Sequence, residues 1–172
     1  ASIWGRCRAI EMMDAGITVA IGSDATAPDR SGDMFRHVQQ CMHYHRRHFR
    51  DPGVLPPGKA LEMVTIDAAR ALGMEGEIGS LEVGKKADIV AVDHAKPHLY
   101  PFNMPLYRVA CFANGADVDT VIVNGKLLMQ GRSVATVSEG AVLDAAQQAT
   151  ETMLDRTGLR HLLEPPETVF GA

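Results

Sequence analysis

One short run of residues constrains the fold of this chain more than any other feature. Residues 17–22 read Ile-Thr-Val-Ala-Ile-Gly, which is almost wholly apolar and rich in β-branched side chains. Such a run predicts a strand that is covered on both faces, as strands of parallel sheets are. A helical pattern over residues 7–15 precedes it and ends at Gly16. We therefore expect an α/β fold in which a loop, residues 23–32, leaves the C-terminal end of this strand.

Helical patterns follow that loop. Apolar residues recur near helical spacing over residues 33–49, and Asp33 is placed to cap the helix N-terminus. A second helical stretch covers residues 57–73, with Thr65 placed to cap a new turn midway. Two helices are therefore expected after the first strand.

The pattern changes to short β segments at about Glu77. Residues 78–84 and 87–92 have the apolar runs and glycine punctuation of strands. Asn124-Gly125 separates two further apolar runs, residues 118–123 and 126–129. Because Asn-Gly favours the tight turns that join antiparallel strands, the sequence predicts a hairpin there.

The remaining segments have different predicted structures. The class of residues 101–114 stays open, although Leu106, Val109 and Ala110 would suit one helical face. Residues 138–154 are alanine-rich and predict an amphipathic helix. An extended terminus is expected at residues 164–167, which read Glu-Pro-Pro-Glu.

The composition of the chain indicates what kind of partner it binds. The chain has 17 basic and 21 acidic residues with no long run of one sign, so no nucleic-acid or membrane footprint is present. The expected partner is a small molecule. Cys7, Cys41 and Cys111 lack any C-x-x-C spacing, which argues against a disulfide framework and favours a reducing cytoplasm. No stretch suits a membrane span or a signal peptide.

Asp24 stands at the mouth of the predicted strand 17–22. Barrels of α/β type place their catalytic groups at the C-terminal ends of strands, so this position favours a catalytic carboxylate. The alternative is that Asp24 caps a turn or the next helix, as aspartate often does. The residues alone leave both interpretations open.

Four blocks in order resemble one known family. The first is Asp14 to Asp24, which resembles the eighth barrel strand of the amidohydrolase superfamily, with Ser23 in place of the usual threonine. The others are residues 60–73, 78–90 and 118–125, which resemble the helical pair after that strand, the return into the small β domain, and its hairpin. The resemblance covers residues 8 to 154.

The branch of the superfamily follows from two further segments. Asp33-Met-Phe35 and the loop before Leu55-Pro-Pro57 resemble aminohydrolases that act on heterocycles, such as deaminases of adenosine derivatives, guanine and cytosine, and triazine hydrolases. The dihydroorotase branch commonly carries histidine where Ala25 stands here. The resemblance thus favours the deaminase and chlorohydrolase branch.

The resemblance implies a role for Asp24 as catalytic residue and metal contact. In the family, the matching aspartate contacts a metal-bound water, takes its proton and delivers it to the departing group. The implied cofactor is a divalent metal, zinc rather than iron. The family's other ligands lie upstream of strand eight, outside this chain, so the fragment alone is expected to be inactive.

Histidines on the predicted helix 33–49 do not replace those ligands. His43 and His45 are two residues apart, and such positions on a helix point in different directions. His37, Cys41, His45 and His48 would share one helical face, but one helix cannot surround a metal. The plain interpretation of this face is a packed and partly solvated surface.

Other polar residues are given structural roles. His94, His98 and His161 are expected at the surface rather than as ligands. Asp29 and Asp33 follow Asp24 on one loop and could contact substrate or cap the next helix, with capping favoured.

The expected architecture has three parts. Residues 1–73 form the last β/α elements of a (β/α)8 TIM barrel, and residues 74–134 form part of a small β-sandwich, or composite, domain with a barrel-packing insert near 101–114. Residues 135–172 form a C-terminal helix and tail. A partial barrel exposes strand edges and apolar helix faces, so we expect association with the missing barrel part or a homo-oligomer.

Three functional hypotheses remain after the sequence is read. The first is the C-terminal part of an aminohydrolase that deaminates or dechlorinates a heterocycle such as a nucleobase, a nucleoside derivative or a triazine. The second is a non-catalytic binding or scaffold remnant of the fold. In the third, the amidohydrolase acts on a cyclic amide or an amide-linked amino acid.

Overall fold

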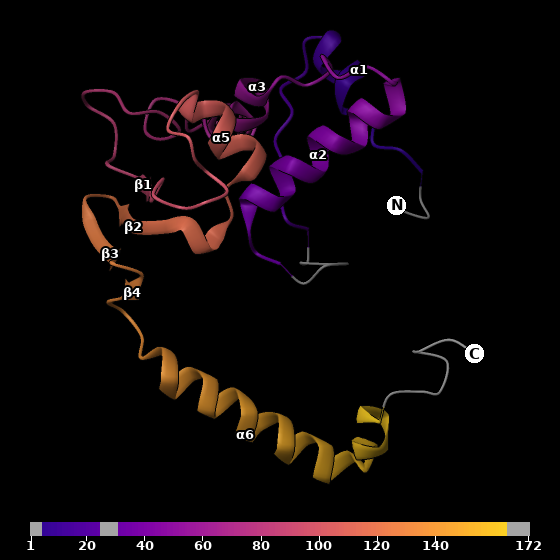
Figure 1. The fold of residues 1–172 in the computed structure, drawn as a ribbon, viewed down its shortest axis with the longest axis vertical. Helices are drawn as coiled ribbons and strands as arrows, with labels where there is room; N and C mark the ends of the chain where they lie inside the picture. The colour runs from indigo at the N-terminus through magenta and orange to yellow at the C-terminus, as the bar shows by residue number, and fades with distance from the viewer. Residues whose placement is uncertain (1–4, 25–30, 165–172) are drawn as a thin grey trace. The chain divides into compact units, whose positions relative to one another are not determined.

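The computed structural model describes residues 5–24 and 31–164 (Figure 1). The chain divides between Ser133 and Val134 into two compact units, which are taken in turn below. The α-helices of the first unit are α1 (Ala9–Asp14), α2 (Met34–Phe49), α3 (Pro57–Glu62), α4 (Ile66–Ala71) and α5 (Pro105–Phe112). The sheet consists of β1 (Ile89–Val92), β2 (Val118–Val123), β3 (Lys126–Gln130) and β4 (Ser133–Val134), in that order, and the division between the units falls within β4.

Helix α2 confirms the prediction for residues 33–49. Asp33 is its N-cap, and the Asp33 carboxylate accepts hydrogen bonds from the backbone N–H groups of Phe35 and Arg36. Such a side-chain cap satisfies amide groups that have no partner within the helix. The helix ends at Arg50, whose φ is 53°. Local signals at both ends therefore define this helix.

The predicted stretch 57–73 consists of two short helices, α3 and α4. The break falls at Thr65, as expected, but the Thr65 side chain makes no cap. Its hydroxyl instead donates to the carbonyl oxygen of Leu61, 2.8 Å away in the preceding turn. The prediction of a Thr65 cap is wrong because a threonine hydroxyl can also bond backward along a helix.

The core of the first unit lies between α2, α3 and α5, which pack against one another (Figure 1). Its buried members are mostly aliphatic and sulfur-containing side chains: Val38, Met42, Leu55, Ala60, Met63 and Ala110. Met42 and Met63 are the larger of these, and they fill the space between helices.

Residues 17–23 are extended but form no strand. Within the described chain, this segment has no ladder with a neighbouring strand. Two backbone hydrogen bonds hold it instead: the Ile17 N–H donates to the Met12 carbonyl oxygen at 2.9 Å, and the Ile21 N–H donates to the Met63 carbonyl oxygen at 3.1 Å. The prediction of a paired strand at 17–22 is wrong for this chain. A strand needs partner strands for its backbone groups, and the described residues supply none beside it.

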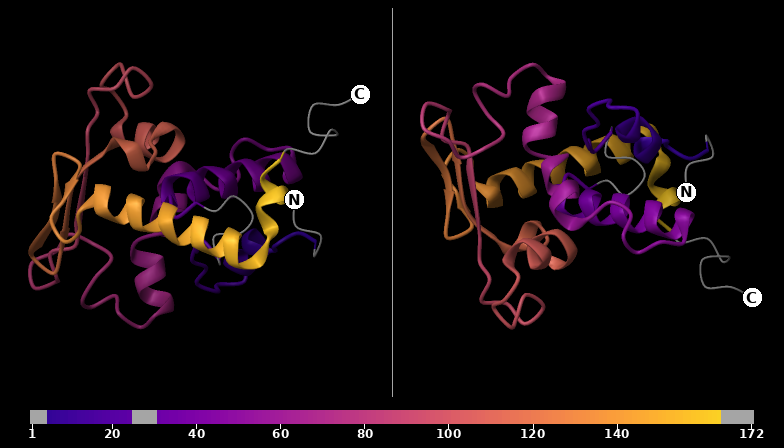
Figure 2. Two further views of the ribbon diagram at one scale, coloured as in Figure 1. Left: turned by 90° about the horizontal axis from the view of Figure 1, so that it is seen from below. Right: turned by 90° about the horizontal axis from the view of Figure 1, so that it is seen from above.

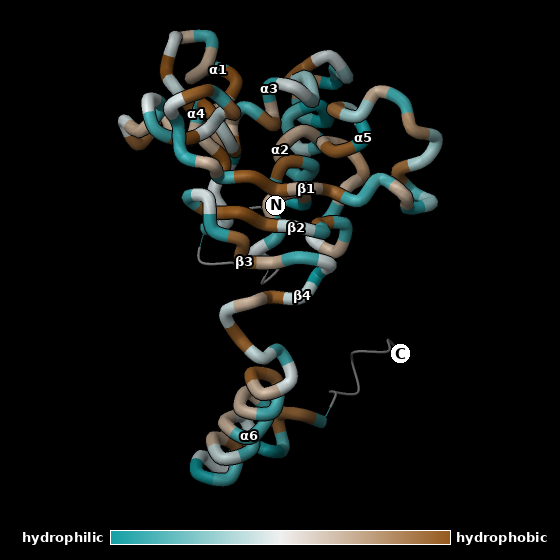
Figure 3. Tube along the Cα trace, turned by 90° about the vertical axis from the view of Figure 1, so that its left-hand side faces the viewer, coloured by the Kyte–Doolittle hydropathy of each residue, from teal (hydrophilic) through white to brown (hydrophobic). Residues whose placement is uncertain are grey.

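The hairpin prediction is confirmed. β2 and β3 pair antiparallel, with Val123 opposite Lys126, and β1 pairs with the other edge of β2, with Ile89 opposite Ile122 (Figures 2 and 3). In the connecting turn, Asn124 and Gly125 have φ angles of 48° and 75°. Two successive positive φ values define a type I′ turn, which matches the twist of the two strands.

Residues 78–84 are turns rather than the predicted strand. Gly79 and Gly84 both have positive φ, at 92° and 96°, which interrupts extended backbone. Gly79 also passes so close to α4 that a Cβ there would lie 2.8 Å from the Cβ of Ala69. Gly79, which we interpreted as strand punctuation, therefore allows a close approach of the chain to α4, whereas a Cβ at Gly84 would meet no atom within 4 Å. Within the predicted segment 87–92, residues 89–92 form β1.

Residues 101–114 contain helix α5, and the short 3-10 helix η1 (Gly115–Asp117) follows. Asn114 caps η1: its side chain accepts from the N–H of Ala116, and Asp117 bonds back to the N–H of Asn114. We call residues 113–117 the η1 turn. It joins α5 to β2.

The second unit contains helix α6 (Glu139–Thr157) and the 3-10 helix η2 (Leu159–Leu163), and it confirms the predicted C-terminal helix. Gly158, with φ at 67°, ends α6 and starts η2. Leu154 is buried, whereas Val142 and Leu143 are exposed. The predicted extended terminus falls mostly in residues 165–172, outside the described residues.

Candidate active site

The site begins with the side chains of the extended segment before Asp24. Val19 and Ile21 are partly buried against the helical core, while Thr18, Ala20 and Gly22 are exposed. This alternation has the two-residue period of extended backbone. One face of the segment therefore rests on the helices, and the other face is open.

Asp24 ends the extended segment as an exposed residue. Its φ is 48°, in the left-handed region that aspartate tolerates better than most residues. The Ser23 hydroxyl lies 3.4 Å from the Asp24 backbone oxygen and donates to it. An exposed carboxylate at this point can accept a proton from a bound molecule and return it.

Ser31, the next described residue after Asp24, is held by α2. The Ser31 side-chain oxygen accepts from the N–H of Asp33 at 3.0 Å. Nε2 of buried His37 lies 3.0 Å from the Ser31 carbonyl oxygen, and it donates in the tautomer protonated at Nε2. Asp33 caps α2, as the sequence predicted. Asp29, the other acidic residue of this loop, lies outside the described residues.

Asp33 also makes a contact that the sequence did not reveal. Its second carboxylate oxygen accepts a hydrogen bond from the N–H of Gly115 at 2.8 Å. The two residues are 82 positions apart, and no local pattern links them. The contact joins the N-terminus of α2 to the η1 turn.

The histidine and cysteine face of α2 is a packed surface. His45 is 2% exposed, and burial lowers its pKa, with the charges of Arg6 and His48 adding to the effect. Burial raises the pKa of Cys41 to about 11. His48 is exposed. Within residues 5–24 and 31–164, no three His, Cys, Asp or Glu side chains come close enough together to hold a metal ion. Buried His45 and exposed His48 agree with the interpretation of this face as packed and partly solvated.

The remaining histidines are mostly at the surface, as expected. His161 is exposed, and His98 is 43% exposed and bonded to the buried carboxylate of Asp117 at 2.9 Å. His94 differs, because it is partly buried and its ring meets the ring of Phe102 edge to face. His94 therefore lies partly at the surface, in the loop after β1.

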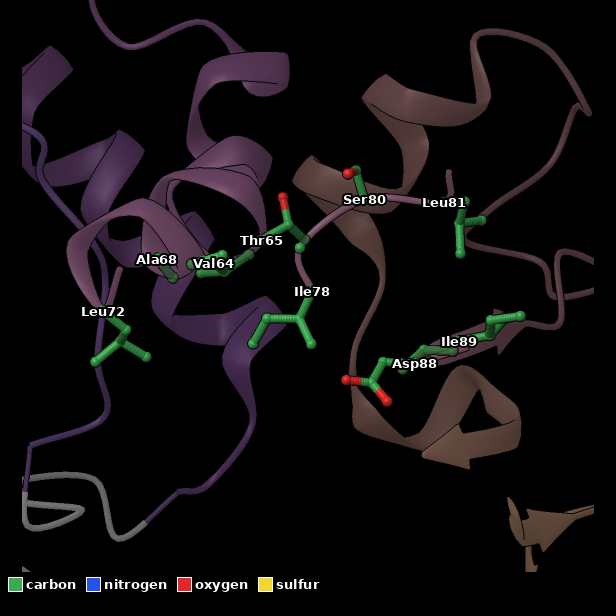
Figure 4. Close-up of a pocket in the computed structure, with 12 residues that line it drawn as sticks. Val64, Thr65, Ala68, Leu72, Ile78, Ser80, Leu81, Asp88 and Ile89 are labelled. Atoms are coloured by element: carbon green, nitrogen blue, oxygen red, sulfur yellow. The ribbon is translucent and has the colours of Figure 1, made fainter. Parts of the chain in front are cut away.

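A depression of about 360 Å³ lies between α4 and β1 (Figure 4). Leu72 and Ala68 line it on the α4 side, Ile78 lies in its middle, and Asp88 and Ile89 line the opposite side. Apart from Asp88 its lining carries no ionisable group, and Asp24 is not part of it. Its apolar character suits packing rather than catalysis.

A charge cluster around the buried carboxylate of Asp67 lies beside the start of the extended segment. Thr18 and Val19 line one small depression with Lys59, Asp67 and Arg70. The Asp67 carboxylate, whose side chain is 6% exposed, accepts from Lys59 at 2.5 Å and from Arg70 at 2.7 Å. Burial opposes ionisation of Asp67, but the two hydrogen bonds outweigh it, so the pKa of Asp67 lies below its usual value.

The family model of the amidohydrolases matches residues 4–128, a region that includes the extended segment, Asp24 and the hairpin turn. The chain belongs to the amidohydrolase family. Among curated relatives, the 5-methylthioadenosine/S-adenosylhomocysteine deaminase of Moorella thermoacetica is 46% identical over 127 residues, covering 74% of this chain and 30% of that protein. The 5'-deoxyadenosine deaminase of Methanosarcina acetivorans is 39% identical, covering 85% of this chain and 33% of that protein.

Solved structures of amidohydrolases place the chain in the same branch. An adenosine deaminase from Xanthomonas campestris with bound zinc matches with a TM-score of 0.82 and 30% identity, covering 86% of this chain and 34% of that one. The atrazine chlorohydrolase TrzN from Arthrobacter aurescens TC1, complexed with zinc, matches with a TM-score of 0.71 and 25% identity, covering 84% and 32%. The resemblance to deaminases and chlorohydrolases is confirmed, and so is an α/β hydrolase fold.

The chain spans about a third of the length of the curated relatives it matches. This bears on the metal that the zinc-containing structures imply. Asp24 offers one carboxylate, and the described residues bring no other His, Cys, Asp or Glu into a ligand group with it. The side chains of residues 5–24 and 31–164 therefore do not form a metal site of their own. Among the same residues, no helix is both long and apolar enough to cross a membrane.

Proposed function

We propose that this chain is the C-terminal part of an aminohydrolase that removes an amino group from the purine ring of an adenosine derivative by hydrolysis. The observation that carries the proposal is the placement of Asp24. It ends an extended segment whose one face packs on helices and whose other face is open, within the region that matches the amidohydrolase family. The named deaminases among the relatives support the substrate class.

Asp24 has the central role in the proposed reaction. A water molecule attacks the ring carbon that bears the amino group, and Asp24 accepts the proton that this water loses. Asp24 then delivers the proton to the departing amine, which leaves as ammonia. Its exposure on the open face gives it access to a substrate bound there.

The remaining components of the site are proposed to lie in the rest of the enzyme. The zinc of the two solved relatives supports zinc as the cofactor, with its other ligands outside this chain. We propose that residues 1–73 complete a (β/α)8 barrel and that residues 74–134 complete a small β domain. Exposed apolar side chains such as Ile17, Leu72 and Val90 suit burial against those parts or a second copy.

The test is an assay of the full-length enzyme with 5-methylthioadenosine, S-adenosylhomocysteine, 5'-deoxyadenosine and a chlorotriazine, following release of ammonia or chloride. We expect deamination of at least one adenosine derivative, and Asp24→Asn is expected to lower kcat about 100-fold or more because it cannot carry the proton. Asp14→Asn, at the exposed end of α1, is the matched control and is expected to keep wild-type activity.

Two results would contradict the proposal. If the Asp24→Asn enzyme kept the wild-type kcat, Asp24 would not be the group that transfers the proton. Turnover of the chlorotriazine alone would replace deamination by dechlorination. Amide exchange of residues 18–20 and 22 adds a structural readout, because pairing with barrel strands in the full-length enzyme should protect amides that donate to no backbone carbonyl in this chain.

A further inference from the structure

The starting observation is the divided use of the Asp33 carboxylate. One oxygen caps α2, 2.9 Å from the N–H of Phe35, and the other accepts from the N–H of Gly115 at 2.8 Å. A helix cap needs one acceptor, and serine, threonine or asparagine supply it as well. The second oxygen is therefore available for a separate task, which is to join α2 to the η1 turn.

The η1 turn is itself firmly held by the sheet side of the first unit. The Arg132 guanidinium donates to the carbonyl oxygens of Gly115, Ala116 and Val118. Buried Asp117 accepts from the N–H of Asn114 at 2.9 Å. The turn thus offers α2 a fixed support rather than a mobile loop.

A second bond between α2 and the turn runs beside the first. The Gln39 side-chain amide donates to the carbonyl oxygen of Ala113 at 2.7 Å. Asp33 lies just before α2 and Gln39 lies in its second turn, so the two bonds fasten the N-terminal part of the helix at two points. This part of α2 also holds Ser31, through the N–H of Asp33 and the ring of His37.

We propose that Asp33 is a positioning residue for the reaction of Asp24, acting through its bond to Gly115. The inference rests on the proposed function. Asp24 and Ser31 are the described residues on either side of one loop. The hydrogen bond from Ile21 to Met63 holds the chain before Asp24, and α2 holds Ser31. Loss of the Asp33 to Gly115 bond lets the Ser31 end shift. A misplacement of about 1 Å at a reacting group can cost about 100-fold in rate.

A matched pair of variants isolates this bond. Gly115→Pro removes the N–H that donates to Asp33, and Gly115→Ala keeps it. Proline is acceptable at the first position of η1, because the preceding Asn114 is extended, with φ at -142° and ψ at 170°. An alanine Cβ would lie 3.5 Å from the Asp33 carboxylate, an ordinary contact distance. Asp33→Ser is a third variant, because serine keeps the cap but is too short to reach the turn.

In the full-length enzyme, we expect Gly115→Pro and Asp33→Ser each to lower kcat about 10-fold to 100-fold, with KM changed less than about 3-fold. Gly115→Ala should match the wild type. The double variant should lose no more kcat than either single variant, because both remove the same bond. A residue that serves stability alone would shift the unfolding midpoint and leave kcat unchanged, so this result would overturn the proposal.

Failure of this inference is distinguishable from failure of the proposed function. A wild-type enzyme that is inactive on every substrate of the panel would contradict both the proposed function and the positioning role of Asp33. An active wild type with an equally active Gly115→Pro variant removes the positioning role alone. Amide exchange at Ser31 and Asp33 in the 172-residue chain checks the bond directly, and it should be faster in Gly115→Pro than in Gly115→Ala.

Discussion

Two apolar runs of this chain have similar sequences and different structures. Residues 17–22 read Ile-Thr-Val-Ala-Ile-Gly, and β2 reads Val-Asp-Thr-Val-Ile-Val. β2 is an inner strand with an antiparallel neighbour on each side. The first run is extended but unpaired, and Ile17 is 51% exposed. Strand propensity is therefore not what separates them.

The difference lies in where each run finds its partner. β2 meets β3 after a turn of two residues, so pairing costs little loop entropy and is directed by the turn. The run 17–22 has no such neighbour among the described residues and instead packs one face on the helical core. A parallel strand predicted from sequence thus requires neighbouring strands, and the same sequence need not contain them.

The largest expected effect tests whether the helices alone hold the unpaired run. Met63 is 1% exposed in the core, and its carbonyl oxygen accepts from Ile21. Met63→Ala is expected to lower the free energy of unfolding by about 2 to 5 kcal/mol, because it leaves a cavity. Urea unfolding of the chain measures this, and amide exchange at Ile21 should become faster.

The control for Met63→Ala comes from the paired region. Leu127, on β3, is 48% exposed, so Leu127→Ala is expected to cost less than about 1 kcal/mol. If the two variants were equally destabilised, the idea that the helical core supports residues 17–22 would be wrong.

A smaller effect is expected from the charge cluster beside Thr18 and Val19. Asp67→Asn removes a buried acceptor of two charged hydrogen bonds and should cost about 1 to 3 kcal/mol at pH 7. The folded-state pKa of Asp67 is lowered, so its contribution is complete above the unfolded pKa of about 3.9 and is lost as pH falls through the folded pKa. The difference between wild type and variant should therefore shrink below about pH 4.

Denaturant midpoints at pH 7 and pH 3 measure this dependence. Glu62→Gln is the matched control, because Glu62 contacts the same Lys59 at 3.2 Å but is 53% exposed. Its expected effect is below about 0.5 kcal/mol at either pH. An Asp67→Asn penalty that stays constant from pH 7 to pH 3 would contradict the ion-pair explanation.

The same contrast explains which features the sequence could predict. The cap at Asp33 and the turn at Asn124 are set by residues within a few positions, and both were predicted. The Asp33 to Gly115 bond spans 82 positions and depends on how α2 meets the η1 turn. Gly79 was misread because its reason is the nearby Ala69 rather than a strand boundary. Asp24 was singled out by its place after an apolar run and by family resemblance.

The smallest effect concerns the hairpin turn. Gly125 has a φ of 75°, so Gly125→Ala places a Cβ in the left-handed region and should lower the free energy of unfolding by about 1 kcal/mol. Gly22, at the end of the unpaired run, does not have a positive φ, and a Cβ added there would meet no atom within 4 Å. Gly22→Ala should therefore change stability by less than about 0.5 kcal/mol. A backbone without a positive φ tolerates the added methyl group. Equal losses of stability in Gly125→Ala and Gly22→Ala would therefore mean that residues 17–22 are as conformationally restricted as the hairpin turn.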